Sequence, residues 1–221
     1  MTSSSRKQLI IYDLDGTLVD TAQDIAESTN HMLKTLTGRE LPAEEIRRFV
    51  GQGLHDLVRR ALNTADEALV DRGTRLFGEH YAQHLLDHSR LYPFARETLH
   101  YFKDRIQAVI TNKPDPFVRP LLRGLGVERY FAHVIAPGGG YPKKPDPTAL
   151  KALIACARLR PVDALLVGDS LIDVETGRNA KVLTVILTHG FQEPQALRAA
   201  APDALAADLS EFLTMATQQG W

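Results

Sequence analysis

Short apolar runs alternate with amphipathic stretches along most of the chain. Five runs rich in Val, Ile and Leu lie at residues 9–12, 107–110, 133–136, 164–167 and 182–187, and a weaker sixth lies at 202–206. Runs this short and apolar are typical of strands buried on both faces of a parallel sheet. Residues 116–125 and 147–159 instead space their apolar side chains three and four apart, as helices do. The alternation predicts an α/β fold with a doubly wound, mostly parallel sheet.

Residues 20–90 interrupt this alternation, because no strand-like run lies between the first two predicted strands. One helical face within this stretch collects Leu54, Leu57, Val58, Ala61 and Leu62. Thr21 and Asp24 resemble a capping pair at the start of an earlier helix. We therefore expect an inserted all-helical cap at residues 20–90 and an α/β catalytic core made of residues 1–19 and 91–221.

The composition is that of a globular protein, with 44% hydrophobic residues, which excludes disorder. The formal net charge of −1 argues against binding to nucleic acid or to an anionic membrane surface. The chain has one cysteine, Cys156, so no internal disulfide can form; it lies in an apolar helix pattern and is expected in the core. Residues 1–8 are polar and no long apolar run follows, so we expect a cytoplasmic protein, as a monomer or homodimer.

Polar residues follow four of the predicted strands, directly after three of them and, after the strand at 133–136, in the segment that it leads into. The sequence D-L-D-G-T occupies residues 13–17, T-N-K occupies 111–113, K-K-P-D-P occupies 143–147, and G-D-S occupies 168–170. Ligands in open α/β sheets bind beyond the carboxyl ends of the strands, so these four segments should meet at one edge. An Asp-Gly pair after one strand could be a simple turn, but four such strand ends together favour a site.

The residue types at this edge point to a chemistry. Asp13, Asp15 and Asp169 offer carboxylates that would repel one another unless a cation lay between them. Carboxylates with water suit Mg²⁺, which prefers oxygen ligands in octahedral geometry. A lysine and a threonine facing the same place would neutralise and hydrogen-bond an anion. Together these groups indicate phosphoryl transfer through an aspartyl-phosphate.

The sequence D-L-D-G-T-L-V-D at residues 13–20 resembles the first signature of the haloacid dehalogenase-like hydrolase superfamily. Its other three signatures are matched, in order, by Thr111, by Lys144, and by Asp169 with Asp173. The resemblance covers nearly the whole chain and implies a Rossmann-like hydrolase core with a small helical cap. Within the superfamily, four stretches are most similar to the phosphoglycolate phosphatase family, at residues 49–54, 91–93, 111–114 and 188–191.

The resemblance implies a role for each acidic residue. Asp13 would be the nucleophile that attacks phosphorus. Asp15 would protonate the leaving alcohol and then activate water. Asp13, Asp169 and the backbone carbonyl of Asp15 would ligate Mg²⁺, and Asp173 would orient the metal's surroundings or Lys144.

The remaining matched residues would bind the phosphoryl group. Thr111 and neighbouring backbone N–H groups, including that of Asn112, would hold its oxygens. Lys144 would balance the charge on Asp13 and on the phosphate. The implied partner is a small phosphorylated metabolite, with 2-phosphoglycolate favoured. For the substrate carboxylate, His55 and Arg59 in the cap are candidates by residue type.

Other functions stay open from the sequence. Another small-molecule phosphatase, a pyrophosphatase or a sugar phosphomutase would use the same chemistry. A 2-haloacid dehalogenase would need neither Mg²⁺ nor Asp15, and a non-catalytic binding protein should have lost one of the matched residues. His80, His84 and His88 are four apart and could share a helix face, which we expect to be solvated. Lys181 stands where relatives commonly carry glycine, at the end of a helix.

Overall fold

A computed structural model describes residues 6–221, so the part of the predicted core at residues 1–5 lies outside the described residues. Six parallel strands form one sheet in the order β5-β4-β1-β6-β7-β8. Their bounds are β1 (Leu9–Tyr12), β4 (Ile106–Ile110), β5 (His133–Ile135), β6 (Ala164–Gly168), β7 (Leu183–Leu187) and β8 (Ala204–Ala206). Each predicted strand is present within two residues, and the predicted doubly wound sheet is confirmed.

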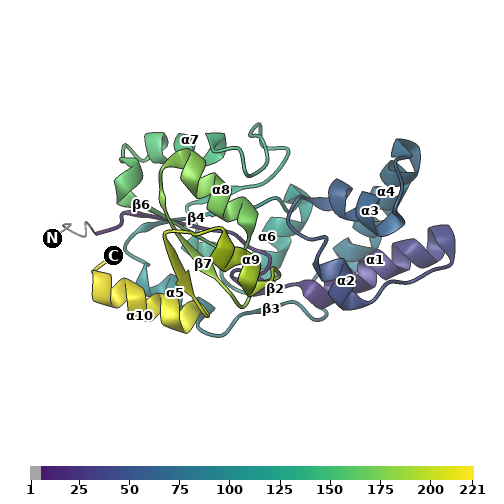
Figure 1. Cartoon of the computed structure of the whole chain (residues 1–221), viewed down its shortest axis with the longest axis horizontal. Coiled ribbons are helices and arrows are strands. Elements are labelled where there is room, and N and C mark those ends of the chain that lie inside the picture. The colour runs from purple at the N-terminus through teal and green to yellow at the C-terminus, as the bar shows by residue number, and fades with distance from the viewer. Residues whose placement is uncertain (1–5) are drawn as a thin grey trace.

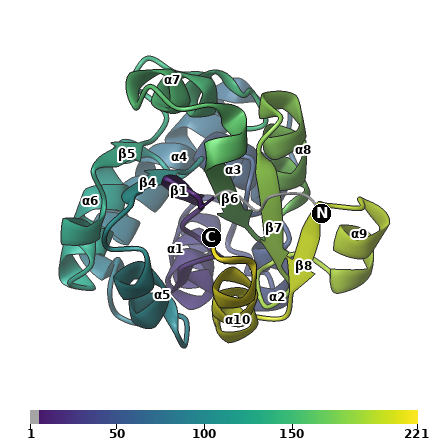
Figure 2. The ribbon, with the colours of Figure 1, turned by 90° about the vertical axis from the view of Figure 1, so that its left-hand side faces the viewer.

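Helices cover both faces of the sheet (Figure 2). Leu9 and Ile11 point to the face that α7 (Thr148–Cys156) and α8 (Leu171–Ala180) cover. Ile10 and Tyr12 point to the opposite face, which is covered by α5 (Ala95–Tyr101), α6 (Asp115–Gly124) and α10 (Leu209–Gln219). All four side chains of β1 are fully buried, which explains why the strand is apolar at every position rather than at every second one.

The remaining elements around the six-stranded sheet are short. They are the helix α9 (Pro194–Ala199) and two 3-10 helices, Glu128–Tyr130 and Pro161–Asp163. Leu197 of α9 packs with Val174 and Ile186 in a small cluster outside the sheet's main core.

Cys156 is the last residue of α7 and is exposed, so the expectation that it lies in the core is wrong. The apolar face of α7 ends one turn earlier, with Leu153 and Ile154. None of the helices in residues 6–221 is both long and apolar enough to cross a membrane.

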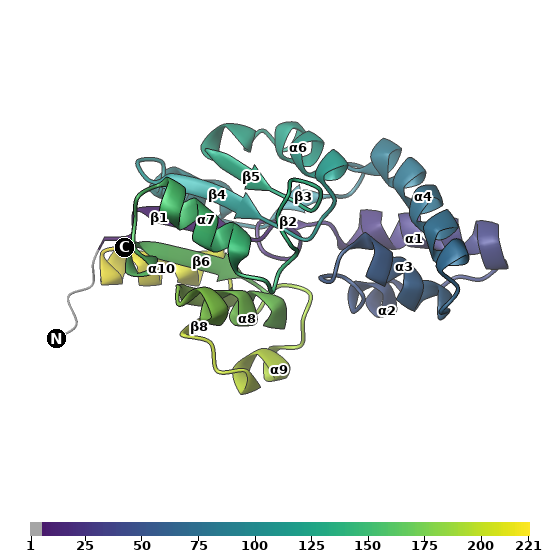
Figure 3. The ribbon, with the colours of Figure 1, turned by 90° about the horizontal axis from the view of Figure 1, so that it is seen from above.

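Four helices lie between β1 and α5 along the chain. They are α1 (Ala22–Thr37), α2 (Ala43–Arg47), α3 (Leu54–Leu62) and α4 (Glu67–His84). They lie beyond the edge to which the strand arrows point (Figures 1 and 3). Two short antiparallel strands, β2 (Val19–Asp20) and β3 (Arg90–Leu91), pair at the beginning and end of this segment. These two strands were not predicted, because two residues are too few to show a period.

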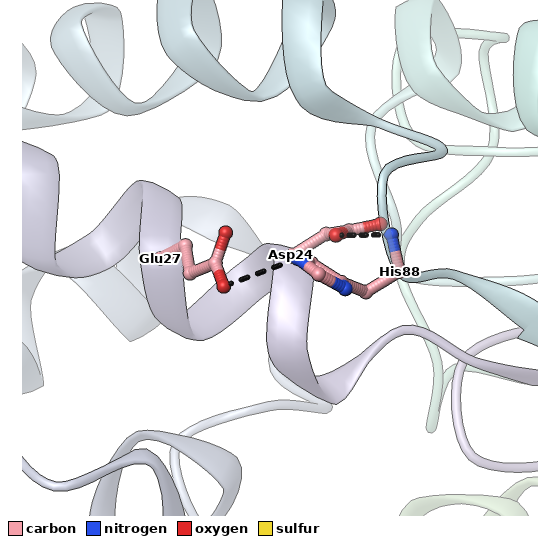
Figure 4. A group of neighbouring side chains, drawn as sticks. All are labelled: Asp24, Glu27 and His88. Atoms are coloured by element: carbon pink, nitrogen blue, oxygen red, sulfur yellow. Dashed lines mark hydrogen bonds and ion pairs between the residues drawn. The ribbon is translucent and has the colours of Figure 1, made fainter.

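Asp24 holds the chain where it returns from these helices to the sheet. Its two carboxylate oxygens accept the backbone N–H groups of His88 and Ser89, each at 2.8 Å, and the Ser89 hydroxyl at 2.6 Å. Glu27 lies 3.3 Å from Nε2 of His88 (Figure 4). The expected capping pair is therefore wrong, since Asp24 turns to this return segment and Thr21 makes no capping hydrogen bond. Because both Asp24 oxygens accept hydrogen bonds from the return segment, the cluster of Asp24, Glu27 and His88 has a structural role.

The three histidines do not share one face. Helix α4 ends at His84, so His88 lies outside it. His80 instead stacks between His31 and His84, with both pairs of ring centres 4.2 Å apart. Its Nδ1 is 3.0 Å from the hydroxyl oxygen of Ser28.

Candidate active site

Three carboxylates meet where two neighbouring strands end. Asp13 follows β1, Asp169 follows β6, and Asp173 lies in the first turn of α8. One oxygen from each lies within 4.8 Å of the others. Because β1 and β6 are adjacent and parallel, their carboxyl ends place these residues together, as the sequence predicts.

Lys144 brings the one ammonium group that contacts this cluster within the described part of the chain. Its Nζ lies 2.9 Å from Oδ2 of Asp13 and 2.7 Å from Oδ1 of Asp173. The lysine side chain is 2% exposed, so this contact is screened little by water. Three carboxylates and one ammonium give the cluster a formal charge of −2. A divalent cation with oxygen ligands would neutralise it, so the donor set fits Mg²⁺.

Burial and the neighbouring charges raise the pKa values of two of these carboxyl groups. Burial, followed by the charges of Asp13 and Asp173, raises the pKa of Asp169 to about 8. Burial also raises the pKa of Asp13 to about 6, although Lys144 acts in the opposite direction. Without a cation, the cluster therefore tends to take up protons near neutral pH.

Asp169 is held in place by residues of two stretches that the sequence analysis named, 13–17 and 188–191, without giving them this role. The Thr17 hydroxyl donates to its Oδ1 at 2.7 Å, and the Phe191 N–H donates to its Oδ2 at 2.9 Å. Gly16 and Gly190 border the carboxylate on two sides, and a Cβ on either would overlap it. Gly190 and Phe191 reach Asp169 because they follow β7, the strand beside β6.

Asp15 lies apart from the three clustered carboxylates. Its Oδ1 accepts hydrogen bonds from Lys113 Nζ at 2.9 Å and from the Thr21 hydroxyl at 2.8 Å. Lys113 also donates to the Tyr81 hydroxyl of α4 at 2.7 Å. Burial alone would lower the pKa of Lys113, but Asp15 and then Tyr81 outweigh it and raise that pKa above its usual value. Sequence reasoning missed both Lys113 and Tyr81; the position of Lys113 at a strand end was the available signal.

Thr111 and Asn112 follow β4 and line the same pocket as Asp13 and Asp15. The Thr111 hydroxyl accepts the backbone N–H of Lys113 at 3.1 Å. The Asn112 side chain donates to the carbonyls of Gly51 and Lys144 and accepts the N–H of Lys144, each at 2.9 Å. The amide of Asn112 therefore positions the Lys144 segment. Its backbone N–H finds no acceptor among residues 6–221, and phosphate binding by Asn112 would use that group.

A pocket of about 60 Å³ opens between these strand ends and the helices α1, α3 and α4. Its polar floor is formed by Asp13, Asp15, Thr111, Asn112 and Lys113. Its apolar wall includes Ile25, Val50, Leu54, Leu57, Phe77 and Phe117. His55 and Arg59 do not line it: both side chains are 40% exposed and pair with Glu67 on the surface. Their suggested contact with a substrate carboxylate is therefore not supported.

Comparison with known proteins matches residues 10–187 to the family model described as haloacid dehalogenase-like hydrolase. The phosphoglycolate phosphatase of Vibrio parahaemolyticus is 35% identical over 93% of this chain and 94% of its own length. The phosphoglycolate phosphatase of Nitrosospira multiformis is 38% identical over 91% of this chain and 92% of its own.

A solved structure shares the fold. The crystal structure of a predicted phosphoglycolate phosphatase from Haemophilus somnus superposes with a TM-score of 0.88 at 32% sequence identity. The match covers 96% of this chain and 98% of that one. The similarity thus includes both the sheet and the helices α1–α4.

Proposed function

The chain belongs to the haloacid dehalogenase-like hydrolase family, as a phosphatase similar to the phosphoglycolate phosphatases, and we propose that it hydrolyses 2-phosphoglycolate with Mg²⁺ through an aspartyl-phosphate. The observation that carries the mechanism is the cluster of Asp13, Asp169 and Asp173 around Lys144, in which Asp13 also lines the pocket. The helices α1–α4 are proposed to act as its cap.

Asp13 is the proposed nucleophile. Its Oδ1 accepts the Leu14 N–H at 2.7 Å and its Oδ2 faces Lys144, so the carboxylate is fixed in orientation. Attack of an Asp13 oxygen on phosphorus forms the acyl phosphate and breaks the bond to the ester oxygen. Hydrolysis then returns Asp13 as a carboxylate and releases phosphate.

Asp15 is the proposed proton donor and acceptor. It lines the same pocket two residues from Asp13, without joining the metal-type cluster through its carboxylate. In the first step it gives a proton to the leaving alkoxide, and in the second it takes one from the attacking water. Its hydrogen bonds from Thr21 and Lys113 hold the side chain at the polar floor of the pocket.

The phosphoryl oxygens need donors that stay in place as charge develops. Lys144, the Thr111 hydroxyl and the backbone N–H groups of Asp15 and Asn112 are suited to this, because neither of those two N–H groups meets an acceptor within residues 6–221. Asp13, Asp169 and the backbone carbonyl of Asp15 would hold Mg²⁺. When bound, the ion would neutralise the cluster and polarise the phosphoryl group.

The substrate assignment is supported by the relatives and by the small pocket. A sugar phosphate or a pyrophosphate would use the same floor, so these remain the alternatives. The presence of both Asp15 and the Mg²⁺-type cluster argues against a haloacid dehalogenase. The single cysteine supports a reducing cellular compartment.

The test is release of phosphate from a panel of esters, with and without Mg²⁺, by the natural protein and by Asp13→Asn. We expect phosphoglycolate to rank first by kcat/KM, EDTA to abolish turnover, and Asp13→Asn to be inactive with an unchanged circular dichroism spectrum. A higher rank for several sugar phosphates would overturn the substrate. Substantial turnover by Asp13→Asn would overturn the nucleophile.

A further inference from the structure

We propose that Lys113, together with Tyr81 of α4, binds the carboxylate of the substrate and thereby selects carboxylated phosphate esters. This inference rests on the proposed function, since it concerns the end of the substrate that does not react. Substrate selection would then depend on two residues together, Lys113 after strand β4 and Tyr81 in helix α4.

Both residues of this pair are buried at the pocket. Lys113 is 6% exposed and Tyr81 is 1% exposed, and both line the pocket. An ammonium carries three N–H donors. Lys113 uses them on Asp15, at 2.9 and 3.3 Å to its two oxygens, and on the Tyr81 hydroxyl. If the Asp15 carboxylate takes a single N–H, one N–H of Lys113 stays available, as does the hydroxyl hydrogen of Tyr81, which has no acceptor in the described part of the chain.

The position matches the length of a short carboxylated ester. Asp15 must lie next to the ester oxygen to give it a proton, and Lys113 contacts Asp15 directly. In 2-phosphoglycolate a single carbon separates that oxygen from the carboxylate. A substrate carboxylate placed there falls beside the ammonium and the phenol, while the phosphoryl group stays at Asp13.

The rest of the pocket gives a carboxylate no other charged partner. Of the residues that line it, all of them in the described chain, Lys113 alone carries a positive charge. The wall contributed by α1, α3 and α4 is apolar, with Ile25, Leu57 and Phe77 among its side chains. Burying a carboxylate against such a surface is costly unless a charged donor meets it. Lys144 is already engaged by Asp13 and Asp173.

A purely structural role for Lys113, fixing Asp15, predicts something different. It would affect the binding of all phosphate esters equally. Carboxylate binding instead changes the ratio of the dissociation constants of two ligands that differ only in having a carboxylate. The experiment therefore compares 3-phosphonopropanoate, which mimics phosphoglycolate but cannot be hydrolysed, with propylphosphonate, which lacks the carboxylate. Calorimetry on the Mg²⁺-loaded protein gives both dissociation constants without turnover.

We expect the natural protein to bind 3-phosphonopropanoate roughly 10- to 100-fold more tightly, the value of one charge-assisted hydrogen bond. Lys113→Met should reduce this ratio to near one, and Tyr81→Phe should reduce it by a smaller factor while keeping the ammonium. Lys143→Met is the matched control, because Lys143 is exposed and its ammonium donates a hydrogen bond to the Gln52 carbonyl at 3.0 Å; its ratio should not change.

An unchanged ratio in Lys113→Met, or no preference in the natural protein, would overturn the inference. If Lys113→Met fails to fold, the ratio in Tyr81→Phe decides in the same way. Failure of the proposed function looks different: no ester would release phosphate with Mg²⁺, yet the two phosphonates would still be distinguished through Lys113.

Discussion

Gly190 lies directly against the carboxylate of Asp169, and a Cβ atom at that position would overlap the carboxylate. The neighbouring Phe191 N–H donates to the same carboxylate at 2.9 Å. The loop after β7 thus determines where this proposed metal ligand lies, although it contributes no ligand itself.

Gly190→Ala should accordingly weaken metal binding. The methyl group must displace the Asp169 side chain or the loop, so we expect the Mg²⁺ concentration for half-maximal activity to rise roughly tenfold or more, about 1.4 kcal/mol of binding free energy. A Mg²⁺ titration of phosphate release measures this. Gly78→Ala is the control, because its Cβ would meet only Phe117 at an ordinary 3.6 Å. An unchanged Mg²⁺ requirement in Gly190→Ala would show that Asp169 does not need its present position.

Replacing Lys144 should reduce both turnover and stability. Lys144→Ala leaves three buried carboxylates without their ammonium, and breaking a buried ion pair costs about 3–5 kcal/mol of unfolding free energy. Loss of charge stabilisation in the transition state should lower kcat by about 10²–10³ or more. Urea unfolding and steady-state kinetics measure the two effects. Lys143→Ala, at an exposed neighbouring position, should change neither. If Lys144→Ala lowers kcat by less than tenfold, another group supplies this positive charge.

The strands and the main site could be predicted because they depend on local pattern and parallel topology. Buried strands such as β1 are apolar at every position, and the carboxyl ends of parallel strands share one edge. Asp13 and Asp169 could therefore be placed together without knowing any contact.

The contacts between the helical segment and the sheet could not be predicted in this way. Tyr81 and Lys113 meet across 32 residues of sequence, and neither differs in type from many other residues of the chain. His55 and Arg59 were candidates by residue type, but Glu67 on the next helix engages both at the surface. Which positively charged side chain faces the pocket depends on how the helices pack. No periodic pattern in a single sequence reveals this packing.

Lys181 has the conformation that its place at a helix end suggested. It ends α8 with φ of 59° and ψ of 40°, the left-handed region, which costs a non-glycine residue about 1–2 kcal/mol. Lys181→Gly should raise the free energy of unfolding by up to about 1 kcal/mol, after the greater flexibility of glycine in the unfolded chain is subtracted. Urea denaturation measures it, and kcat should not change. A loss of stability would show that Lys181 makes a compensating contact.

Metal binding and protonation should compete at the carboxylate cluster. The pKa of Asp13 is raised to about 6 and that of Asp169 to about 8, by burial first and then, for Asp169, by the other two carboxylates. Without metal, the folded protein binds more protons than the unfolded chain between these values and the ordinary pKa of 3.8. These two groups therefore make the metal-free protein less stable as pH rises from about 4 to about 8.

Mg²⁺ replaces those protons, so its stabilising effect should have the opposite pH dependence. At pH 8, a Mg²⁺ concentration 100-fold above the dissociation constant should raise Tm by about 5 °C or more. At pH 5 the same concentration should raise it much less, because protons occupy the site. Thermal unfolding followed by circular dichroism measures the shift, with Asp169→Asn as the variant in which it should nearly vanish at both pH values. An equal shift at pH 5 and pH 8 in the natural protein would mean that the ion does not compete with protons and therefore binds outside this carboxylate cluster.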